Sequence, residues 1–191
     1  MAVAAGIMVP HPPLIVPDVG RGQEILIKDT IKAYQEAAGM AAELKPDTIV
    51  VISPHAVMYA DYFHVSPGKE ARGDFGRFMA PQIGVEAGYD EAFVRELDRL
   101  CGDDDFPMGT EGEREKELDH GTLVPLYFIN QHYRDYKLVR IGGSGLSFAD
   151  HYRAGRYIAR VAENLGRSVF IVASGDLSHK LRGDGPYGYS V

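Results

Sequence analysis

Thr48-Ile49-Val50-Val51-Ile52 is β-branched and apolar throughout, and Ser53-Pro54-His55 follows it directly. An unbroken run of this kind is typical of a strand in the middle of a parallel sheet, where both faces of the strand are buried. Such a sheet needs helices over each face, because parallel strands are joined by long crossover connections. The stretch therefore predicts an α/β fold built around a central strand at 48–52.

Helices and further strands alternate on either side of this stretch. Upstream, the pattern predicts a strand at 3–9 and an amphipathic helix at 24–44, whose apolar residues are spaced by three or four. Downstream, it predicts strands at 62–66, 138–141 and 168–173, helices at 89–100, 123–129 and 148–165, and an exposed loop or hairpin at 68–76. This alternation indicates a single domain over residues 1–191, α/β in class, with helix–sheet–helix layers and a largely parallel or mixed central sheet.

The composition is that of an ordinary globular protein with an acidic balance. Of 191 residues, 45 % are hydrophobic and 25 % are charged, and the formal net charge is −7. This charge, without any long basic run, argues against nucleic acid or an anionic membrane as the main partner. We also find no pattern of a targeting segment or a membrane helix, and the single cysteine, Cys101, cannot form an internal disulfide. We therefore expect a cytoplasmic protein.

Four of the seven histidines stand where predicted strands end or a helix begins. His11 follows the strand at 3–9, and His55 follows the central strand. His120 stands at the start of a helix, and His179 lies just beyond the last strand. Because ligands of open α/β sheets bind beyond the carboxyl ends of the strands, we expect these imidazoles at one edge of the sheet. Imidazole is both the commonest metal ligand and a general acid–base near neutral pH.

The other chemistry-bearing residues fit structural roles better. Cys101 stands beside the acidic run 103–105, which would raise the pKa of its thiol and make it a poor nucleophile. The glycine-rich segment 142–145 matches neither the P-loop nor the dinucleotide-binding pattern, so we favour a tight turn over an anion-binding loop. We expect structural or solvated positions for the remaining histidines, His64, His132 and His151.

Four motifs follow one another along the chain. They are Gly6-Ile7-Met8-Val9-Pro10-His11-Pro12-Pro13, Ile52-Ser53-Pro54-His55, Asp119-His120-Gly121 and Ser174-Gly175-Asp176-Leu177-Ser178-His179. Their order resembles that of the class III extradiol ring-cleavage dioxygenases, B-subunit type, and of the related Memo-like proteins. The resemblance spans almost the whole chain and is specific for this superfamily, but it does not specify a substrate.

The resemblance implies a non-haem Fe(II) held by two histidines and a carboxylate, with open positions for a catechol and for O₂. Carried over by motif, His11 and His55 resemble the two histidine ligands, whose ring nitrogens we expect about 3–4 Å apart. His179 resembles the acid–base that handles the substrate hydroxyl proton. His120 resembles a histidine that contacts substrate or oxygen, and Asp176 matches an acidic position of the Memo-like branch.

The resemblance leaves the third metal ligand unassigned in this chain. In the family the carboxylate lies well after the last histidine motif, whereas this chain ends twelve residues past His179. We therefore expect a domain shortened at its C-terminus, without its third protein ligand. Of the acids near the histidine motifs, Asp176 is the best substitute, because Asp119 adjoins His120 and is expected to orient that ring. Asp61 is the other acid near these motifs. A shortened domain leaves apolar faces uncovered, which predicts a homo-oligomer.

Three functions use the same histidines, and the sequence leaves all three open. The first is a dioxygenase that opens the ring of a small aromatic diol with Fe(II) and O₂. The second is a Memo-like metal-binding or regulatory protein without ring-cleaving activity. The third is a hydrolase built around Zn²⁺, whose open coordination position would acidify a water molecule. Zn or Cu in place of iron is compatible with histidine ligands.

Overall fold

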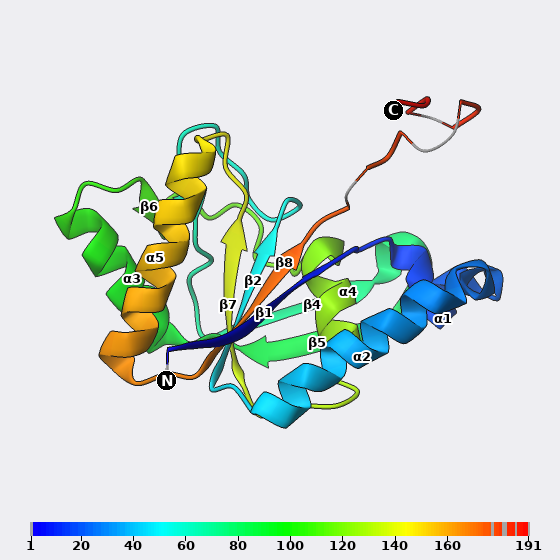
Figure 1. The fold of residues 1–191 in the computed structure, drawn as a ribbon, viewed down its shortest axis with the longest axis horizontal. Helices are drawn as coiled ribbons and strands as arrows, with labels where there is room; N and C mark the ends of the chain where they lie inside the picture. The colour runs from blue at the N-terminus through cyan, green and yellow to red at the C-terminus, as the bar shows by residue number, and fades with distance from the viewer. Residues whose placement is uncertain (1, 177, 181–182, 186, 191) are drawn as a thin grey trace.

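The computed structural model describes residues 2–176, 178–180, 183–185 and 187–190 (Figure 1). Its main sheet has four strands, in the order β1 (Val3–Val9), β8 (Val169–Ser174), β2 (Thr48–Ser53) and β7 (Lys137–Gly142). All of its pairings are parallel, with Val9 opposite Ser174 and Ile52 opposite Ala173. The apolar stretch at 48–52 therefore does form an inner strand of a parallel sheet.

The remaining elements flank this sheet. The helices are α1 (Pro17–Gly20), α2 (Lys28–Leu44), α3 (Glu91–Asp103), α4 (His120–Ile129) and α5 (Phe148–Leu165), with 3₁₀ turns at Pro13–Ile15, Gln23–Ile27 and Gly76–Phe78. The other strands form two pairs, β4 (Glu70–Phe75) antiparallel to β5 (Ala80–Gly88) and β3 (Phe63–His64) parallel to β6 (Met108–Gly109). None of the helices that the structure describes is both long and apolar enough to cross a membrane.

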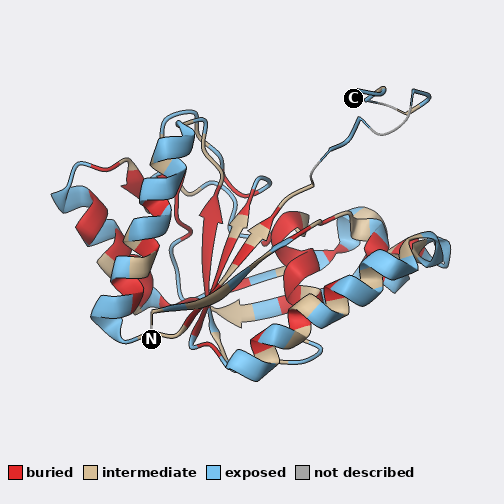
Figure 2. Ribbon diagram, in the orientation of Figure 1, coloured by how far each residue is buried: buried red, intermediate tan, exposed pale blue. Residues whose placement is uncertain are grey.

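Helices cover both faces of the sheet (Figures 1 and 2). On one face, Ile49 and Val51 of β2 belong to a core that α2, α4 and the β4–β5 hairpin complete. On the other face, Val50 belongs to a second core with α3 and α5. Neighbouring residues of β2 thus enter opposite cores, as the two-residue period of a strand requires. The predicted helix–sheet–helix layering is confirmed.

Two segments differ from the sequence prediction. The helix predicted at 24–44 is wrong at its start, because Gln23–Ile27 is a 3₁₀ turn and the α-helix begins at Lys28. Strand β5 was not predicted at all. It carries two glycines and only two buried apolar residues, Ala80 and Val85, so it lacks the continuous apolar run of the central strands. The segment 68–76, expected to be a loop or a hairpin, contains β4, the first strand of a hairpin that β5 completes.

The glycines after β7 allow two chain segments to approach closely. A Cβ on Gly142 would lie 1.9 Å from the carbonyl oxygen of Val57. A Cβ on Gly145 would lie 2.7 Å from the carbonyl oxygen of Ala60. The glycine-rich segment is therefore explained by tight backbone packing, as its sequence predicts.

Candidate metal centre

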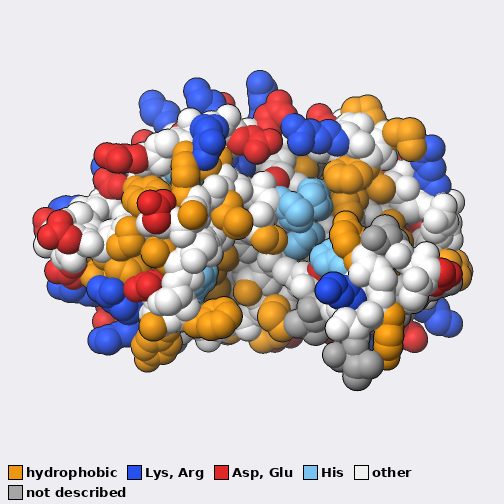
Figure 3. All heavy atoms as spheres, turned by 90° about the horizontal axis from the view of Figure 1, so that it is seen from above, with side chains coloured by type: hydrophobic (Ala, Val, Ile, Leu, Met, Phe, Trp, Pro, Cys, Tyr) orange, Lys and Arg blue, Asp and Glu red, His pale blue; other side chains and the backbone are white. Residues whose placement is uncertain are grey.

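Three histidines converge at the edge of the sheet where the parallel strands end. His11 lies two residues past β1, His55 lies two residues past β2, and His120 is the first residue of α4. The Nε2 atoms of His11 and His55 are 3.1 Å apart, and the ring centroids of His55 and His120 are 4.0 Å apart. Figure 3 looks onto this edge and shows histidine side chains near the middle of the face. The 3.1 Å distance between the Nε2 atoms agrees with the expected separation of about 3–4 Å.

The three rings offer a compact set of nitrogen donors. One nitrogen from each ring lies within 4.8 Å of the other two. A single ion with metal–nitrogen bonds of about 2.0–2.2 Å spans nearly that separation. His11 is buried, His120 is half-buried and His55 is exposed, so the cluster is open to solvent on one side. This donor set fits a divalent transition-metal ion, for which imidazole is a suitable ligand.

Burial keeps two of the imidazoles neutral. It lowers the pKa of His11 below the usual range; Asp176 opposes this effect, and the neighbouring His55 ring adds to it. Burial, followed by the nearby His55 and His11 rings, lowers the pKa of His120 to about 4. Near neutral pH both rings therefore present an unprotonated nitrogen, which is the form that binds a metal ion.

Groups at the end of β8 hold His11 from two directions. Its Nδ1 lies 2.9 Å from Ser174 Oγ, and its backbone N–H donates to Asp176 Oδ1 at 3.2 Å. The second carboxylate oxygen, Asp176 Oδ2, lies 3.9 Å from His11 Nε2 and 3.2 Å from His179 Nε2. Asp176 thus brings His179, whose side chain is 56 % exposed, to the solvent side of the cluster. Leu177 of the same motif lies outside the described residues.

Ser53 and Asp119 position His55. The backbone N–H of His55 donates to Ser53 Oγ at 3.2 Å, and the Ser53 hydroxyl donates to Asp119 Oδ1 at 2.5 Å. Asp119 also caps α4, because its carboxylate accepts from the backbone N–H and the hydroxyl of Thr122. The expected orienting bond from Asp119 to the His120 ring is absent from the hydrogen bonds of the described residues. Asp119 instead stabilises the N-terminus of α4, whose first residue is His120.

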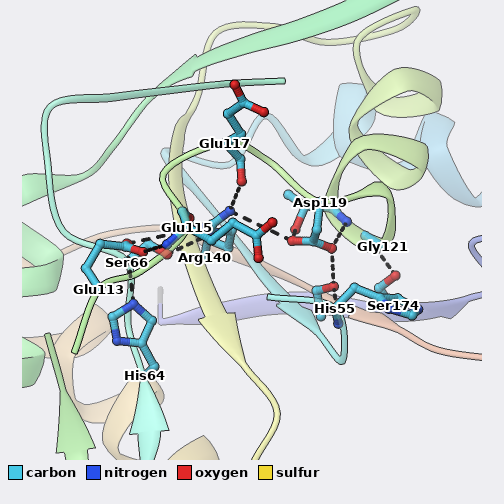
Figure 4. A network of polar contacts seen from close by, with 12 residues as sticks. His55, His64, Ser66, Glu113, Glu115, Glu117, Asp119, Gly121, Arg140 and Ser174 are labelled. Carbon is cyan, nitrogen blue, oxygen red and sulfur yellow. Dashed lines mark hydrogen bonds and ion pairs between the residues drawn. The ribbon is translucent and has the colours of Figure 1, made fainter. Parts of the chain in front are cut away.

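A buried arginine on β7 anchors the segment that leads into α4 (Figure 4). Its guanidinium donates to Ser66 Oγ, Glu117 O and Glu115 O at 2.7, 2.7 and 2.5 Å. The carboxylates of Glu113 and Asp119 each lie 3.8 Å from it. This residue, Arg140, is fully buried, and sequence reasoning missed it. A lone charge between Val139 and Ile141, inside an apolar strand, is the sequence signal that identifies such a residue.

The other candidate residues occupy the structural positions that their sequence context predicts. Cys101 is buried, and burial, followed by Asp98 and Asp104, raises the pKa of its thiol to about 12. The direction agrees with the prediction, although burial rather than the acidic run is the main cause. Asp61 is exposed. The remaining histidines bond outside the cluster, His64 to Glu111 O, His132 to Gln35 and His151 to Ser147 O.

Comparison with known proteins finds similarity to aromatic ring-opening dioxygenases. Residues 5–191 match the model of a family described as the catalytic LigB subunit of aromatic ring-opening dioxygenase. Over 190 residues the chain is 39 % identical to a protein of Clostridium acetobutylicum whose name states no activity, covering 96 % of this chain and 41 % of that protein. Over 160 residues it is 26 % identical to the 3,4-dihydroxyphenylacetate 2,3-dioxygenase of Escherichia coli, covering 81 % of this chain and 57 % of that enzyme. The chain therefore spans about half the length of these curated relatives.

Proposed function

Since the chain belongs to the family of the catalytic LigB subunit of aromatic ring-opening dioxygenases, we propose that it carries the metal centre of an extradiol dioxygenase. In this proposal His11 and His55 hold Fe(II), and the substrate is a small aromatic diol that is cleaved with O₂. The observation that carries the proposal is the 3.1 Å approach of the two Nε2 atoms from separate strand ends. The Escherichia coli relative makes 3,4-dihydroxyphenylacetate the first substrate to test.

Fe(II) would supply open coordination positions that bring the diol and O₂ together. The protein's part is to hold His11 rigidly against β8 while His55 faces the open side of the cluster. Asp176 lies 3.9 Å from His11 Nε2, which makes it our candidate for the carboxylate that completes the metal-binding set. The same carboxylate holds His179 at 3.2 Å, so one residue links the metal-binding histidines to the proposed acid–base.

In this proposal His179 moves a proton between the site and solvent. Its side chain is half-exposed, and Asp176 fixes the position of its Nε2. We assign it the role of accepting the substrate hydroxyl proton, and we assign His120 a direct contact with substrate or oxygen. The Phe78 ring lies 5.4 Å from the His120 ring in an edge-on arrangement, so an apolar surface flanks the cluster where an aromatic ring would bind.

The test is anaerobic loading with Fe(II), followed by addition of the diol and then of O₂. We expect O₂ consumption together with a yellow ring-opened product. His11→Ala and His55→Ala should abolish both iron binding and turnover, whereas His179→Ala should keep its iron and lower turnover by about 10²–10⁴-fold. His151→Ala, on the exposed surface of α5, is the matched control. Tight iron binding without ring opening of any diol would contradict the proposal.

One observation favours a second candidate, a zinc hydrolase. Three imidazole nitrogens within 4.8 Å resemble the three-histidine set of a catalytic zinc site, in which bound water becomes the nucleophile. Ester hydrolysis by the Zn²⁺-loaded protein, without O₂ uptake by the Fe(II)-loaded protein, would support this candidate. Metal binding with neither activity would instead support a metal-binding or regulatory protein of the Memo-like kind.

A further inference from the structure

Helix α4 contains a proline in its interior, Pro125, at its sixth position. In an α-helix the N–H of each residue donates to the carbonyl four residues earlier. Proline has no N–H, so the carbonyl of Gly121 lacks its helical donor. Both residues are buried, which keeps water from the freed carbonyl. Because buried carbonyls are almost always hydrogen-bonded, Gly121 needs a donor from another element.

Ser174, at the end of β8, is that donor. Its Oγ lies 2.5 Å from the Gly121 carbonyl oxygen, and Figure 4 shows this contact beside the Asp119 network. A carbonyl only accepts hydrogen bonds, so the single hydroxyl hydrogen of Ser174 is directed to Gly121. Only the acceptor lone pairs of Ser174 remain for other partners. His11 Nδ1 lies 2.9 Å from the same oxygen, so Nδ1 must carry the hydrogen of that contact.

A neutral imidazole carries a hydrogen on one nitrogen and a lone pair on the other. With the hydrogen on Nδ1, the lone pair of His11 is on Nε2, the atom that lies 3.1 Å from His55 Nε2. We propose that Pro125, Gly121 and Ser174 form a positioning relay, which fixes His11 in the Nδ1–H tautomer and directs its Nε2 lone pair into the histidine cluster. The metal-binding consequence of this relay rests on the proposed function, whereas the tautomer does not.

The packing around Gly121 explains why the relay acts on this cluster. A Cβ on Gly121 would lie 2.3 Å from Ser53 Oγ and 3.3 Å from the His55 ring, so the glycine is wedged against the turn that carries His55. Its carbonyl meanwhile bonds Ser174, which pairs with Val9 in the sheet just before His11. The first turn of α4 therefore lies between the two histidines that the proposed metal centre requires.

The tautomer is measured directly in the metal-free protein. Histidine-selective ¹⁵N labelling and long-range ¹H–¹⁵N spectra at neutral pH distinguish a protonated Nδ1 from a protonated Nε2, and His11→Gln identifies the His11 signals. We expect the wild-type protein to show His11 as the Nδ1–H form. Ser174→Ala should convert His11 to a mixture or to the Nε2–H form and weaken Co(II) or Fe(II) binding by about 10–100-fold. Ser174→Thr, which keeps the hydroxyl, should restore both properties.

Two further variants separate the relay from general effects on folding. Pro125→Ala returns an N–H donor to the Gly121 carbonyl, so it should release the Ser174 hydroxyl and mix the tautomers while the helix stays intact. Ser66→Ala removes a serine that is also buried but bonds Arg140, and it should leave His11 unchanged. An Nε2–H form of His11 in the wild-type protein would overturn the inference, as would an unchanged tautomer in Ser174→Ala. The expected tautomer without any metal binding would leave the relay standing and refute the proposed metal centre.

Discussion

Gly121 occupies a tight position in the candidate site, where an added Cβ would displace a neighbouring side chain. The oxygen that its Cβ would meet, Ser53 Oγ at 2.3 Å, is the one that holds both the His55 backbone and Asp119. We predict that Gly121→Ala displaces Ser53 and tilts His55. The expected results are an unfolding free energy lower by about 1–3 kcal/mol and metal affinity lower by about 10–100-fold.

Urea denaturation and a metal titration of the same sample measure the two effects of Gly121→Ala. Gly155→Ala is the matched control, because a Cβ at that position in α5 meets nothing within 4 Å. The control should leave metal binding unchanged and stabilise its helix by up to about 1 kcal/mol. Wild-type metal affinity in Gly121→Ala would show that the packing around Ser53 does not set the position of His55.

The histidines could be predicted from the sequence because a strand end is visible in the local pattern. His11 and His55 each follow an apolar run, so their placement at one sheet edge follows from the fold class alone. Ser174 has no such local signal, because its role is defined by His11, which is 163 residues away in the sequence. Pro125 and Arg140 do carry local signals, a proline in a helix and a charge in a buried strand. Their partners emerge only once the elements are packed.

At the scale of elements, local periodicity located most helices and strands. It did not show which strands lie side by side or which helices pack on them. The predicted strand at 3–9 and helix at 148–165 have the bounds of β1 and α5. Strand β5 was missed because its burial comes from α4 and the main core rather than from its own composition. The placement of β8 between β1 and β2 is likewise a property of the folded sheet. That placement brings Ser174 beside His11, so this hydrogen-bond partner was not predictable, whereas Asp176 was named from its motif.

Strand β7 stabilises the segment before α4 through Arg140. Removing the guanidinium in Arg140→Met leaves the Glu115 and Glu117 carbonyls without a donor and the Glu113 and Asp119 carboxylates without their cation. We predict a loss of about 3 kcal/mol in the free energy of unfolding, measured by urea denaturation. Arg140→Lys should recover only part of this free energy, because the lysine ammonium cannot reproduce the planar set of N–H donors of the guanidinium. Arg156→Met, at an exposed position of α5, should be near neutral, and an equal loss there would contradict the prediction.

Helices α3 and α5 are linked by Glu96, which bonds Arg99 in its own helix and Asn164 in α5. The Arg99 hydrogen bond, followed by that of Asn164, lowers the pKa of Glu96 from 4.5 to about 2. A lowered folded-state pKa means that the contribution to stability is present above pH 4.5 and is lost as the pH falls toward 2.

The pH dependence of Glu96→Gln tests this link. The variant should melt at a lower temperature than the wild type at pH 7, and the difference should shrink as the pH falls from 4.5 to 2. Glu91→Gln, whose ion pair with Arg95 lies within α3 alone, should show no comparable convergence. A difference between wild type and Glu96→Gln that stays constant down to pH 2 would refute the assignment.

At the scale of the whole molecule, one long edge of the described sheet is uncovered. Strand β1 is an edge strand, and Val3 and Met8 on it are 39 % and 63 % exposed. An open apolar edge favours association with another strand. We therefore expect a dimer or larger assembly by light scattering at ~100 µM, and we expect Met8→Lys to shift it toward monomer. Phe148→Lys, at the exposed start of α5, is the control, and a monodisperse wild-type monomer would contradict the expectation.

The candidate site also makes a prediction about the stability of the entire fold. The proposed ligands His11, His55 and Asp176 lie just past β1, β2 and β8, so a bound ion would connect three separate strands. An ion that binds only the folded state adds about 2.7 kcal/mol at a free concentration 100-fold above its Kd. For a chain of this size that corresponds to a rise in Tm of roughly 5–10 °C.

Thermal unfolding with Fe(II) under nitrogen, and separately with Zn²⁺, measures this increment in Tm. It should vanish in His11→Ala and in His55→Ala, because each variant removes one of the two nitrogens that lie 3.1 Å apart. It should persist in His151→Ala, whose ring bonds the Ser147 carbonyl outside the cluster. An increment that survives the double variant His11→Ala/His55→Ala would mean that the ion binds elsewhere. The family's chemistry would then need a different centre, since His11, His55 and His120 form the one group of three possible metal ligands found among the described residues.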